Sequence, residues 1–368
     1  MRRKILYLTL IMVSCIAATL FCSPSEAFIK TKILVISSYH REYIWSQETN
    51  EGFCAAMTKY GYFDEKSDIS DKNDQVAEYT KNDYIENSKV IVKRLWMNTK
   101  KKKSAEEIAN TVSTITRQTK EFKPDLIFLG DDNAAKYIGA QFLDTKIPIV
   151  FWGMNNTPVK YGLVDSIESP GHNVTGVYQS GYYQESLELL KKIVPSIKNF
   201  AVISDDTASG RSHVKKIERL AHKGDLRIKL VAVVVESDFE RWKRKVLKLQ
   251  DRVDAFFIAQ YSGLTSADGS YVPTDKIVEW YMKKVKIPEV AVQGQFVKQG
   301  MLCSADDSGY NQGYTAVEIA HDILSKGNNP ATYSPISPKR GAFMANKKRG
   351  KMLGISFTED MGIEQYIK

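Results

Sequence analysis

The chain has 368 residues and a formal charge of +9, and 43% of its residues are hydrophobic. This composition is ordinary for a globular protein and excludes a low-complexity chain, while the length favours two domains. Basic residues cluster in Lys100–Lys103 and Lys347–Lys351 without interleaved aromatic residues, so both runs predict solvated loops and no nucleic-acid binding.

The N-terminus has the pattern of an export signal. A basic start precedes an apolar run over residues 5–21, and small residues lead up to Ala27. We therefore expect a signal peptide over residues 1–27, cleaved near Ala27, and a periplasmic protein. An uncleaved membrane anchor is one alternative. A lipoprotein signal is another, because Cys15 and Cys22 lie in the run.

Export removes those two cysteines and leaves Cys54 and Cys303. An even pair in an oxidising compartment can form a disulfide, but two cysteines so far apart give no framework signal. We expect two buried thiols.

The segment from Asp125 to Asn156 is the clearest structural unit. It predicts a strand at Asp125–Leu129, a helix at Ala134–Leu143 that Asp132 or Asn133 caps, and a second strand at Ile147–Trp152. In open α/β sheets, ligands bind beyond the carboxyl ends of the strands. The loops GDDN and WGMNN, which follow these two strands, are therefore expected to form a pocket floor.

The same strand–helix alternation runs along most of the chain. Before the central unit we expect strands at 32–37 and 89–96, helices at 47–60 and 105–122, and a polar surface excursion at 63–84. After a crossing segment at 156–173 we expect further strands at 173–178, 199–204, 229–235, 254–260 and 289–292. The helices expected between them are 182–193, 211–222, 238–249 and 274–284. A short helix to Gly300, a return helix at 311–324, a strand at 341–345 and a helix at 347–353 complete the series.

This order predicts an α/β protein with two doubly wound parallel-sheet lobes that are joined by a hinge and close like a clamshell. We assign residues 28–155 plus 296–327 to the N-terminal lobe. The C-terminal lobe is assigned residues 156–295 plus 328–368.

Four stretches carry a resemblance to a known family. They are PDLIFLGDDNAAKYI with KIPIVFWGMNN, NVTGV with ESLELLKKIVPSIKNFAVISD, SADDSGYNQGYTAVEIAHDIL with KGNNPA, and RGAFMANKKRGKMLGI. The chain resembles the substrate-binding proteins of ABC transporters that have the type I periplasmic-binding-protein fold. The resemblance implies an extracytoplasmic protein that captures a small metabolite between its lobes and delivers it to an ABC permease. In the better-known members the ligand is an amino acid, often an aromatic one.

One loop departs from the pattern that the resemblance implies. Family members commonly have Thr or Ser after the strand that corresponds to LIFLG, where a ligand carboxylate can be held. This chain has Asp131, Asp132 and Asn133 there. Because these carboxylates repel a ligand carboxylate, and Asp306 and Asp307 add to them, a polar or aromatic ligand with a neutral or cationic headgroup is favoured.

Candidate ligand-binding residues are those that follow strand ends. The first lobe supplies aromatic groups for stacking and polar groups for orientation: Tyr39, His40, Tyr43, Trp45, Asp131, Asp132, Asn133, Trp152 and Asn155. The second supplies Tyr178, Gln179, Asp205, Gln260, Tyr261, Gln293 and Gln295. A polar–aromatic signature before the return helix adds Asp306, Asp307 and Tyr310.

Each candidate also has a structural alternative. The aromatic residues can pack between lobes, His40 can be solvated, Trp152 can belong to the core, and one of Asp131 and Asp132 can cap a helix. We expect Asp132→Ala to weaken binding sharply and leave the fold intact.

Catalytic and metal motifs are missing from the sequence. There is no G-x-x-x-x-G-K-[ST], G-x-S-x-G or H-E-x-x-H, the five histidines are scattered, and Asp68, Asp71 and Asp74 lack the glycine of a calcium loop. We expect a monomer with no enzymatic activity, cofactor or metal. A periplasmic ligand-sensing module that acts on a membrane receptor is the alternative function, and an exported α/β enzyme is a third.

Overall fold

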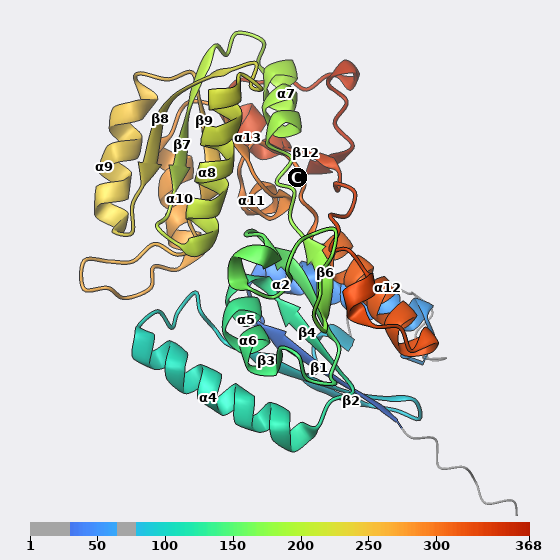
Figure 1. Cartoon of the computed structure of the whole chain (residues 1–368). Coiled ribbons are helices and arrows are strands. Elements are labelled where there is room, and N and C mark those ends of the chain that lie inside the picture. The colour runs from blue at the N-terminus through green and yellow to red at the C-terminus, as the bar shows by residue number, and fades with distance from the viewer. Residues whose placement is uncertain (1–29, 65–78) are drawn as a thin grey trace, which may run out of the picture. The chain divides into compact units, whose positions relative to one another are not determined.

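A computed structural model describes residues 30–64 and 79–368, and within it Thr31–Lys368 forms one compact unit with two sheets (Figure 1). The expected signal peptide and the three aspartates considered for calcium lie outside the described residues.

The first sheet has the strand order β2-β3-β1-β4-β5-β6. Its neighbours pair in parallel except at one edge, where β2 runs antiparallel to β3. The strands are β1 (Thr31–Ser37), β2 (Tyr84–Glu86), β3 (Val90–Trp96), β4 (Leu126–Gly130), β5 (Ile149–Met154) and β6 (Val174–Tyr178).

The second sheet has the order β13-β12-β11-β10-β9-β7-β8, with a single antiparallel pairing between β11 and β12. The strands are β7 (Asn199–Ser204), β8 (Lys229–Val235), β9 (Ala255–Gln260), β10 (Glu289–Ala291), β11 (Cys303–Ala305), β12 (Phe343–Asn346) and β13 (Gln365–Ile367). Two mostly parallel α/β sheets confirm the predicted fold class.

Helices connect the strands of both sheets. Those that belong with the first sheet are α2 (Ile44–Lys59), α4 (Ala105–Phe122), α5 (Asp131–Ala134), α6 (Ala140–Phe142) and α12 (Gly309–Lys326), with a π-turn at Ala135–Gly139. Those of the second are α7 (Tyr183–Ile193), α8 (Ala208–Lys223), α9 (Phe239–Gln250), α10 (Thr274–Lys284), α11 (Gly294–Gln299) and α13 (Lys347–Met352). Short 3₁₀ turns lie at Pro158–Tyr161, Pro330–Thr332 and Glu359–Met361. We call each sheet with its helices a lobe.

The strand pairing places the crossings between the lobes at other residues than the sequence analysis expected. β6 pairs with β5, so the first sheet extends to Tyr178, past the expected boundary at residue 155. β11 pairs with β10 in the second sheet, although residues from 296 onward were expected in the N-terminal lobe. A short apolar run fits either sheet by composition, and only its long-range partner decides between them.

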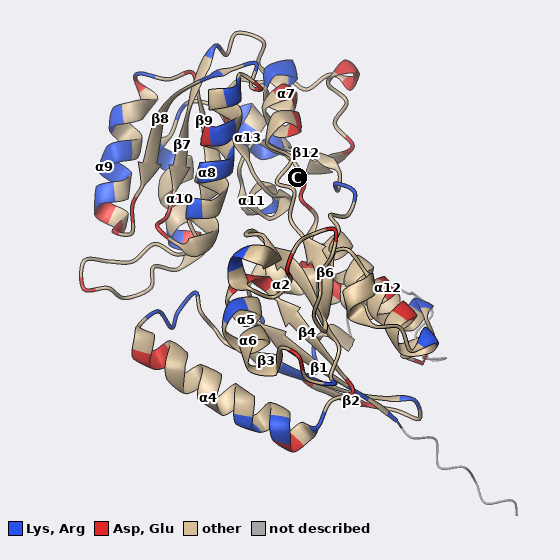
Figure 2. Cartoon of the chain, in the orientation of Figure 1, with Lys and Arg blue, Asp and Glu red and all other residues tan. Residues whose placement is uncertain are grey.

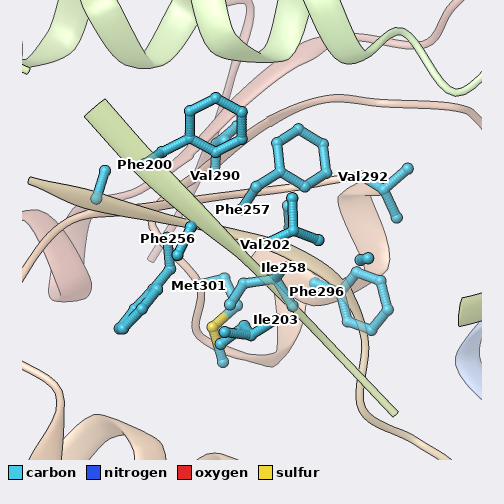
Figure 3. Close-up of a cluster of buried hydrophobic side chains, with 14 of the residues drawn as sticks. Phe200, Val202, Ile203, Phe256, Phe257, Ile258, Val290, Val292, Phe296 and Met301 are labelled. Atoms are coloured by element: carbon cyan, nitrogen blue, oxygen red, sulfur yellow. The ribbon is translucent and has the colours of Figure 1, made fainter. Parts of the chain in front are cut away.

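Hydrophobic side chains fill both faces of each sheet. In β1, Ile33 and Val35 belong to one buried cluster while Leu34 and Ile36 belong to another. This alternation follows from the two-residue period of a strand. The second sheet has one large cluster, of which Figure 3 shows members from β7, β9 and β10 packed together with Phe296 and Met301.

Two glycines allow α2 and α12 to cross at very short distance. A Cβ atom on Gly52 would lie 1.9 Å from the carbonyl oxygen of Tyr310, and one on Gly313 would lie 1.9 Å from that of Thr49. Both helices therefore approach backbone to backbone, which fixes α12 in the first lobe although it follows a strand of the second.

The helix after β4 begins earlier than expected. It starts at Asp131, and neither Asp132 nor Asn133 caps it. The hydroxyl of Ser38, from the loop after β1, instead accepts a hydrogen bond from the backbone N–H of Ala134 (2.8 Å). The capping prediction was wrong because a residue distant in sequence satisfies the free N–H group.

The two basic runs are not simply solvated loops. Figure 2 shows Lys and Arg along α8, α9 and α13. Arg349, in the second run, is 1% exposed and pairs with Glu289, and Lys100, in the first run, is 3% exposed. Cys54 and Cys303 are free and buried, which confirms the expectation of two thiols.

Candidate functional site

Two tyrosine hydroxyls join the lobes beyond the carboxyl ends of the strands. Tyr39, in the loop after β1, lies 3.1 Å from the hydroxyl oxygen of Ser209 at the start of α8. Tyr43, at the N-terminus of α2, donates to Ser262 after β9 (3.5 Å). The two rings contact edge to face at 5.2 Å, so one aromatic pair from the first lobe meets two serines of the second.

Asp131 is a buried carboxylate in an unusual backbone conformation. Its φ is +70°, it is 2% exposed, and one oxygen accepts a hydrogen bond from the indole N–H of Trp45 (2.7 Å). Burial, followed by the neighbouring Asp132, raises the pKa of Asp131 well above its usual value, while the Trp45 bond and Lys100 oppose the rise. A non-glycine residue at positive φ costs free energy, and such residues cluster at functional sites.

Asp132 has a structural role in the first lobe. Its two oxygens accept hydrogen bonds from the backbone and side-chain N–H groups of Asn155 and Asn156 and from the hydroxyl of Tyr161, at 2.9–3.2 Å. All of these donors lie in the segment after β5. The expectation that Asp132→Ala leaves the fold intact does not agree with this network.

Three buried glutamines form a hydrogen-bonded chain at the lobe interface. Gln179 donates to the carbonyl of Gly153 (2.7 Å) and accepts from Gln293 (2.7 Å). Gln293 in turn accepts from Gln295 (2.6 Å), which also donates to the hydroxyl of Tyr43 (3.3 Å). The chain runs from the first lobe through the second and back, so parting of the lobes must break it.

The segments that connect the sheets contain the other two aspartates. One Asp307 oxygen accepts from the backbone N–H of Gly181 (2.8 Å), and Asp306 accepts from that of Gly294 (2.7 Å). Burial raises the pKa of Asp307 to about 7. The Asp307 carboxylate thus links two segments where the chain passes between the sheets, which is the position expected of a hinge residue, whereas the Asp306 carboxylate contacts the start of α11 in the second lobe.

Three buried oxygens near the glutamine chain have no hydrogen-bond partner among the described residues. They are Oδ1 of Asn155, Oε1 of Gln295 and Oδ1 of Asp307. Buried acceptors normally find a donor, because leaving one unpaired costs roughly 1–3 kcal/mol. These unpaired oxygen acceptors at the lobe interface are suited to a ligand that donates hydrogen bonds.

Lys100 and Lys216 were missed by sequence reasoning. The Lys100 ammonium nitrogen lies 4.5 Å from the ring centroid of Tyr39 and 5.2 Å from that of Tyr43. The Lys216 ammonium donates to the backbone carbonyl of Gln179 (3.1 Å). Both residues sit in charged stretches, so composition alone gave no signal that they are turned inward.

His40 lies at the edge of the tyrosine pair. Its ring is 5.8 Å from that of Tyr43, and its buried Nδ1 has no partner among the described residues. Burial, with the nearby Lys101, lowers the pKa of His40 to about 4. A cavity of about 580 Å³ opens here between His40 and Tyr43 of the first lobe and Tyr271 and Asp275 of the second.

Several other candidates serve structure rather than the interface. Trp152 packs on Phe53 and Phe128 in the core, which is the alternative considered for it. Four further candidates form hydrogen bonds within their own lobes. Asn133 donates to Thr99, Asp205 accepts from Thr207 and Gly263, Gln260 accepts from the backbone N–H groups beside it, and Tyr261 donates to Gln299. The last two are more accessible: Tyr178 is half-buried, and Tyr310 is 40% exposed and stacks on Tyr314.

Two lobes of mostly parallel sheet with polar and aromatic groups between them define a ligand-binding protein of the two-lobe class. The family model for ABC transporter substrate-binding proteins matches residues 51–365. The chain belongs to this family, whose members are extracytoplasmic solute-binding proteins rather than enzymes.

Individual relatives agree with this assignment. A tyrosine-binding protein from Clostridioides difficile is 26% identical over 227 residues, which are 60% of this chain and 62% of that protein. The match thus spans less than two thirds of the relative's length.

Solved structures show that the fold is shared. A domain from Streptococcus pneumonia in complex with L-Trp is 20% identical with a TM-score of 0.67, and the match covers 92% of this chain and 100% of that one. The ligand-free, open structure of a substrate-binding protein with adhesive properties from Clostridium difficile is 22% identical with a TM-score of 0.63, covering 92% and 99%. The predicted type I periplasmic-binding-protein fold is confirmed.

Two further features of the described residues bear on the site. They contain no cluster of three or more His, Cys, Asp or Glu placed to hold a metal ion. None of the helices described combines the length and the apolar character needed to cross a membrane.

Proposed function

We propose that this protein captures an aromatic amino acid, or a closely similar metabolite, between its lobes and delivers it to an ABC permease. The observation that carries the proposal is the tyrosine pair, Tyr39 and Tyr43, held at the lobe interface beside buried acceptors without partners. Flat rings stack well on a flat ligand, and the unpaired oxygens supply its orientation.

The relatives support the same ligand class. One is named as tyrosine-binding and another was solved with L-Trp. Family membership supports a permease as the partner. We further propose that the protein acts as a monomer in the periplasm after cleavage near Ala27, and that it has no catalytic activity.

The ligand contacts are proposed for the first-lobe group Tyr39, Tyr43 and Asp131 and for the glutamines Gln179, Gln293 and Gln295. We place the lobe boundaries at the segments where the chain passes between the sheets, which are residues 179–182, 306–308 and 336–342.

Native mass spectrometry of the purified protein, before and after unfolding and refolding, tests the proposal. We expect a small adduct that is lost on unfolding, and refolded protein that regains it from L-tyrosine or L-tryptophan in titration calorimetry. A sugar or nucleoside adduct, or no binding of either amino acid, would overturn the ligand class. Turnover of the added ligand would instead indicate an enzyme.

A further inference from the structure

The lobe interface contains a buried ammonium that no carboxylate neutralises. Lys100 lies in the loop between β3 and α4 and is 3% exposed. Its nitrogen faces the rings of Tyr39 and Tyr43, and no described carboxylate lies within 4.0 Å of it. Ring faces stabilise a cation, but they leave its three N–H donors without strong acceptors.

Asp131 is a buried carboxylate that lacks a cationic partner, as Lys100 lacks an anionic one. It is buried and accepts a hydrogen bond from Trp45, yet among the described residues no Lys, Arg or His lies within ion-pair distance. Its backbone is held at a positive φ, so the chain places this carboxylate there against a conformational cost. A buried carboxylate is stable in its charged form only when a cation or several donors compensate it.

The two groups are near each other without touching. Ser38 joins the two loops, because its carbonyl accepts from the backbone N–H of Thr99 (2.9 Å) and its backbone N–H donates to the carbonyl of Gly130 (2.9 Å). Lys100 also opposes the rise in the pKa of Asp131 that burial causes, although the two do not form an ion pair. Tyr39 contacts Lys100 through its ring, and after burial Asp131 is the largest cause of the raised pKa of its hydroxyl. Both charges therefore belong to one site.

The other charged groups around this site already have partners. Asp132 is saturated by the segment after β5, and Asp205 by its own loop and Gly263. Lys103 donates to the carbonyl of Gly263 (2.6 Å), and Lys216 donates to that of Gln179. Asp307, at a crossing between the sheets, also keeps one oxygen without a partner. Lys100 and Asp131 are the two groups of opposite charge that lie beside the tyrosine pair and Trp45.

We propose that the ligand is a zwitterion, with its ammonium on the Asp131 carboxylate and its carboxylate on the Lys100 ammonium. This inference rests on the proposed function and narrows it. It also replaces the preference for a neutral or cationic headgroup, which counted the aspartates of the GDDN loop and Asp306 and Asp307 but not the buried lysine. An amine without a carboxylate leaves Lys100 unpaired, and an acid without an amine leaves Asp131 unpaired.

The test uses three ligands that differ only at these groups: L-tyrosine, tyramine and 3-(4-hydroxyphenyl)propionate. Calorimetry on the unaltered protein should give L-tyrosine an affinity at least about tenfold higher than either truncated ligand, because each lacks one charge pair. This comparison needs no variant, so it stands even if a substitution prevents folding. Tyramine binding as tightly as L-tyrosine would overturn the role of Lys100.

Two variants then assign the ends of the ligand. Lys100→Met should weaken L-tyrosine and the propionate roughly tenfold or more and leave tyramine within about twofold. Asp131→Asn should weaken L-tyrosine and tyramine by a similar factor and spare the propionate. Lys101→Met and Asp251→Asn, at exposed positions, are the matched controls.

The outcomes separate this inference from the proposed function. If L-tyrosine binds but each variant weakens all three ligands equally, the zwitterion assignment fails and the ligand class stands. If neither L-tyrosine nor the corresponding tryptophan set binds the unaltered protein, the proposed function itself fails.

Discussion

Arg349 and Glu289 form an ion pair that solvent does not reach. The guanidinium Nη2 lies 2.7 Å from one carboxylate oxygen and Nε lies 2.9 Å from the other, with exposed side-chain fractions of 1% and 0%. The guanidinium also donates to the carbonyls of Val285 and Ile287, and Glu289 accepts from the backbone N–H of Leu302. The pair thus ties α13 to the segment between α10 and β10 and to the start of β11.

Removing one partner of this pair should destabilise the protein strongly. Arg349→Met leaves Glu289 buried without its cation, and breaking a buried pair costs about 3–5 kcal/mol of unfolding free energy. Urea unfolding followed by circular dichroism measures the loss. Lys348→Met, at the exposed neighbouring position, is the control and should change stability by less than about 0.5 kcal/mol.

The double variant Arg349→Met/Glu289→Leu should recover part of this loss, because no uncompensated charge then remains in the core. A double variant as unstable as the sum of both single changes would show that packing, rather than charge, determines the cost.

Asp132→Ala should lower the melting temperature as well as any ligand affinity. The change removes the acceptor for donors on Asn155, Asn156 and Tyr161, some of them buried, so we expect a loss of about 2–4 kcal/mol. Asn133→Ala, which breaks one bond to Thr99, is the neighbouring control and should cost about 1 kcal/mol. An unchanged melting temperature with lost affinity would return Asp132 to the ligand site.

Sequence patterns predicted those elements whose limits are set locally. The helices Ala105–Phe122 and Thr274–Lys284 and the strands Asn199–Ser204 and Lys229–Val235 have the expected bounds. The first helix has a complete capping box at Ser104, which is a purely local signal. The partners of β6 and β11 were not predictable in this way, because sheet pairing depends on residues far along the chain.

The candidate site was predicted to a similar extent. The rule that ligands lie beyond strand ends named Tyr39, Tyr43 and the three glutamines, and the structure brings these residues together. Their contact with a ligand stays a prediction. The rule could not separate Asp131 from Asp132, since only the fold shows which carboxylate meets the segment after β5. Lys100 was missed because a lysine run predicts solvation, and burial beneath two rings becomes visible only in three dimensions.

Gly313→Ala should destabilise the crossing of α2 and α12. The added Cβ would meet the carbonyl oxygen of Thr49 at 1.9 Å, and backbone atoms cannot rotate away as a side chain can. The helices must separate, for which we expect a cost of about 3 kcal/mol or more despite the higher helix propensity of alanine. Ser325→Ala, exposed on the same helix, is the control in the same thermal melt. Equal melting temperatures for both variants would contradict the close crossing.

Glu48 should make the stability of the protein depend on pH. It lies in α2 and is 8% exposed, and it pairs with Lys298 of α11 in the second lobe (2.6 Å). Burial first, and then Asp306, raise the pKa of Glu48 from 4.5 to about 7, while Lys298 opposes the rise and Glu51 adds to it. A carboxyl group with a raised folded-state pKa contributes stability that is complete below its unfolded pKa.

That contribution is lost as pH rises from about 4.5 to about 7, because ionisation is then easier in the unfolded chain than in the fold. One such group changes the unfolding free energy by at most roughly 1.4 kcal/mol per pH unit. Glu48→Gln cannot ionise, so its urea midpoints at pH 5 and pH 8 should differ less than those of the unaltered protein. Asp307, whose pKa is also raised to about 7, should maintain a residual slope in the variant. Glu51→Gln, at an exposed position of the same helix, is the control and should keep most of the dependence of stability on pH. If stability depends on pH equally in Glu48→Gln and in the unaltered protein, Glu48 is not the titrating group.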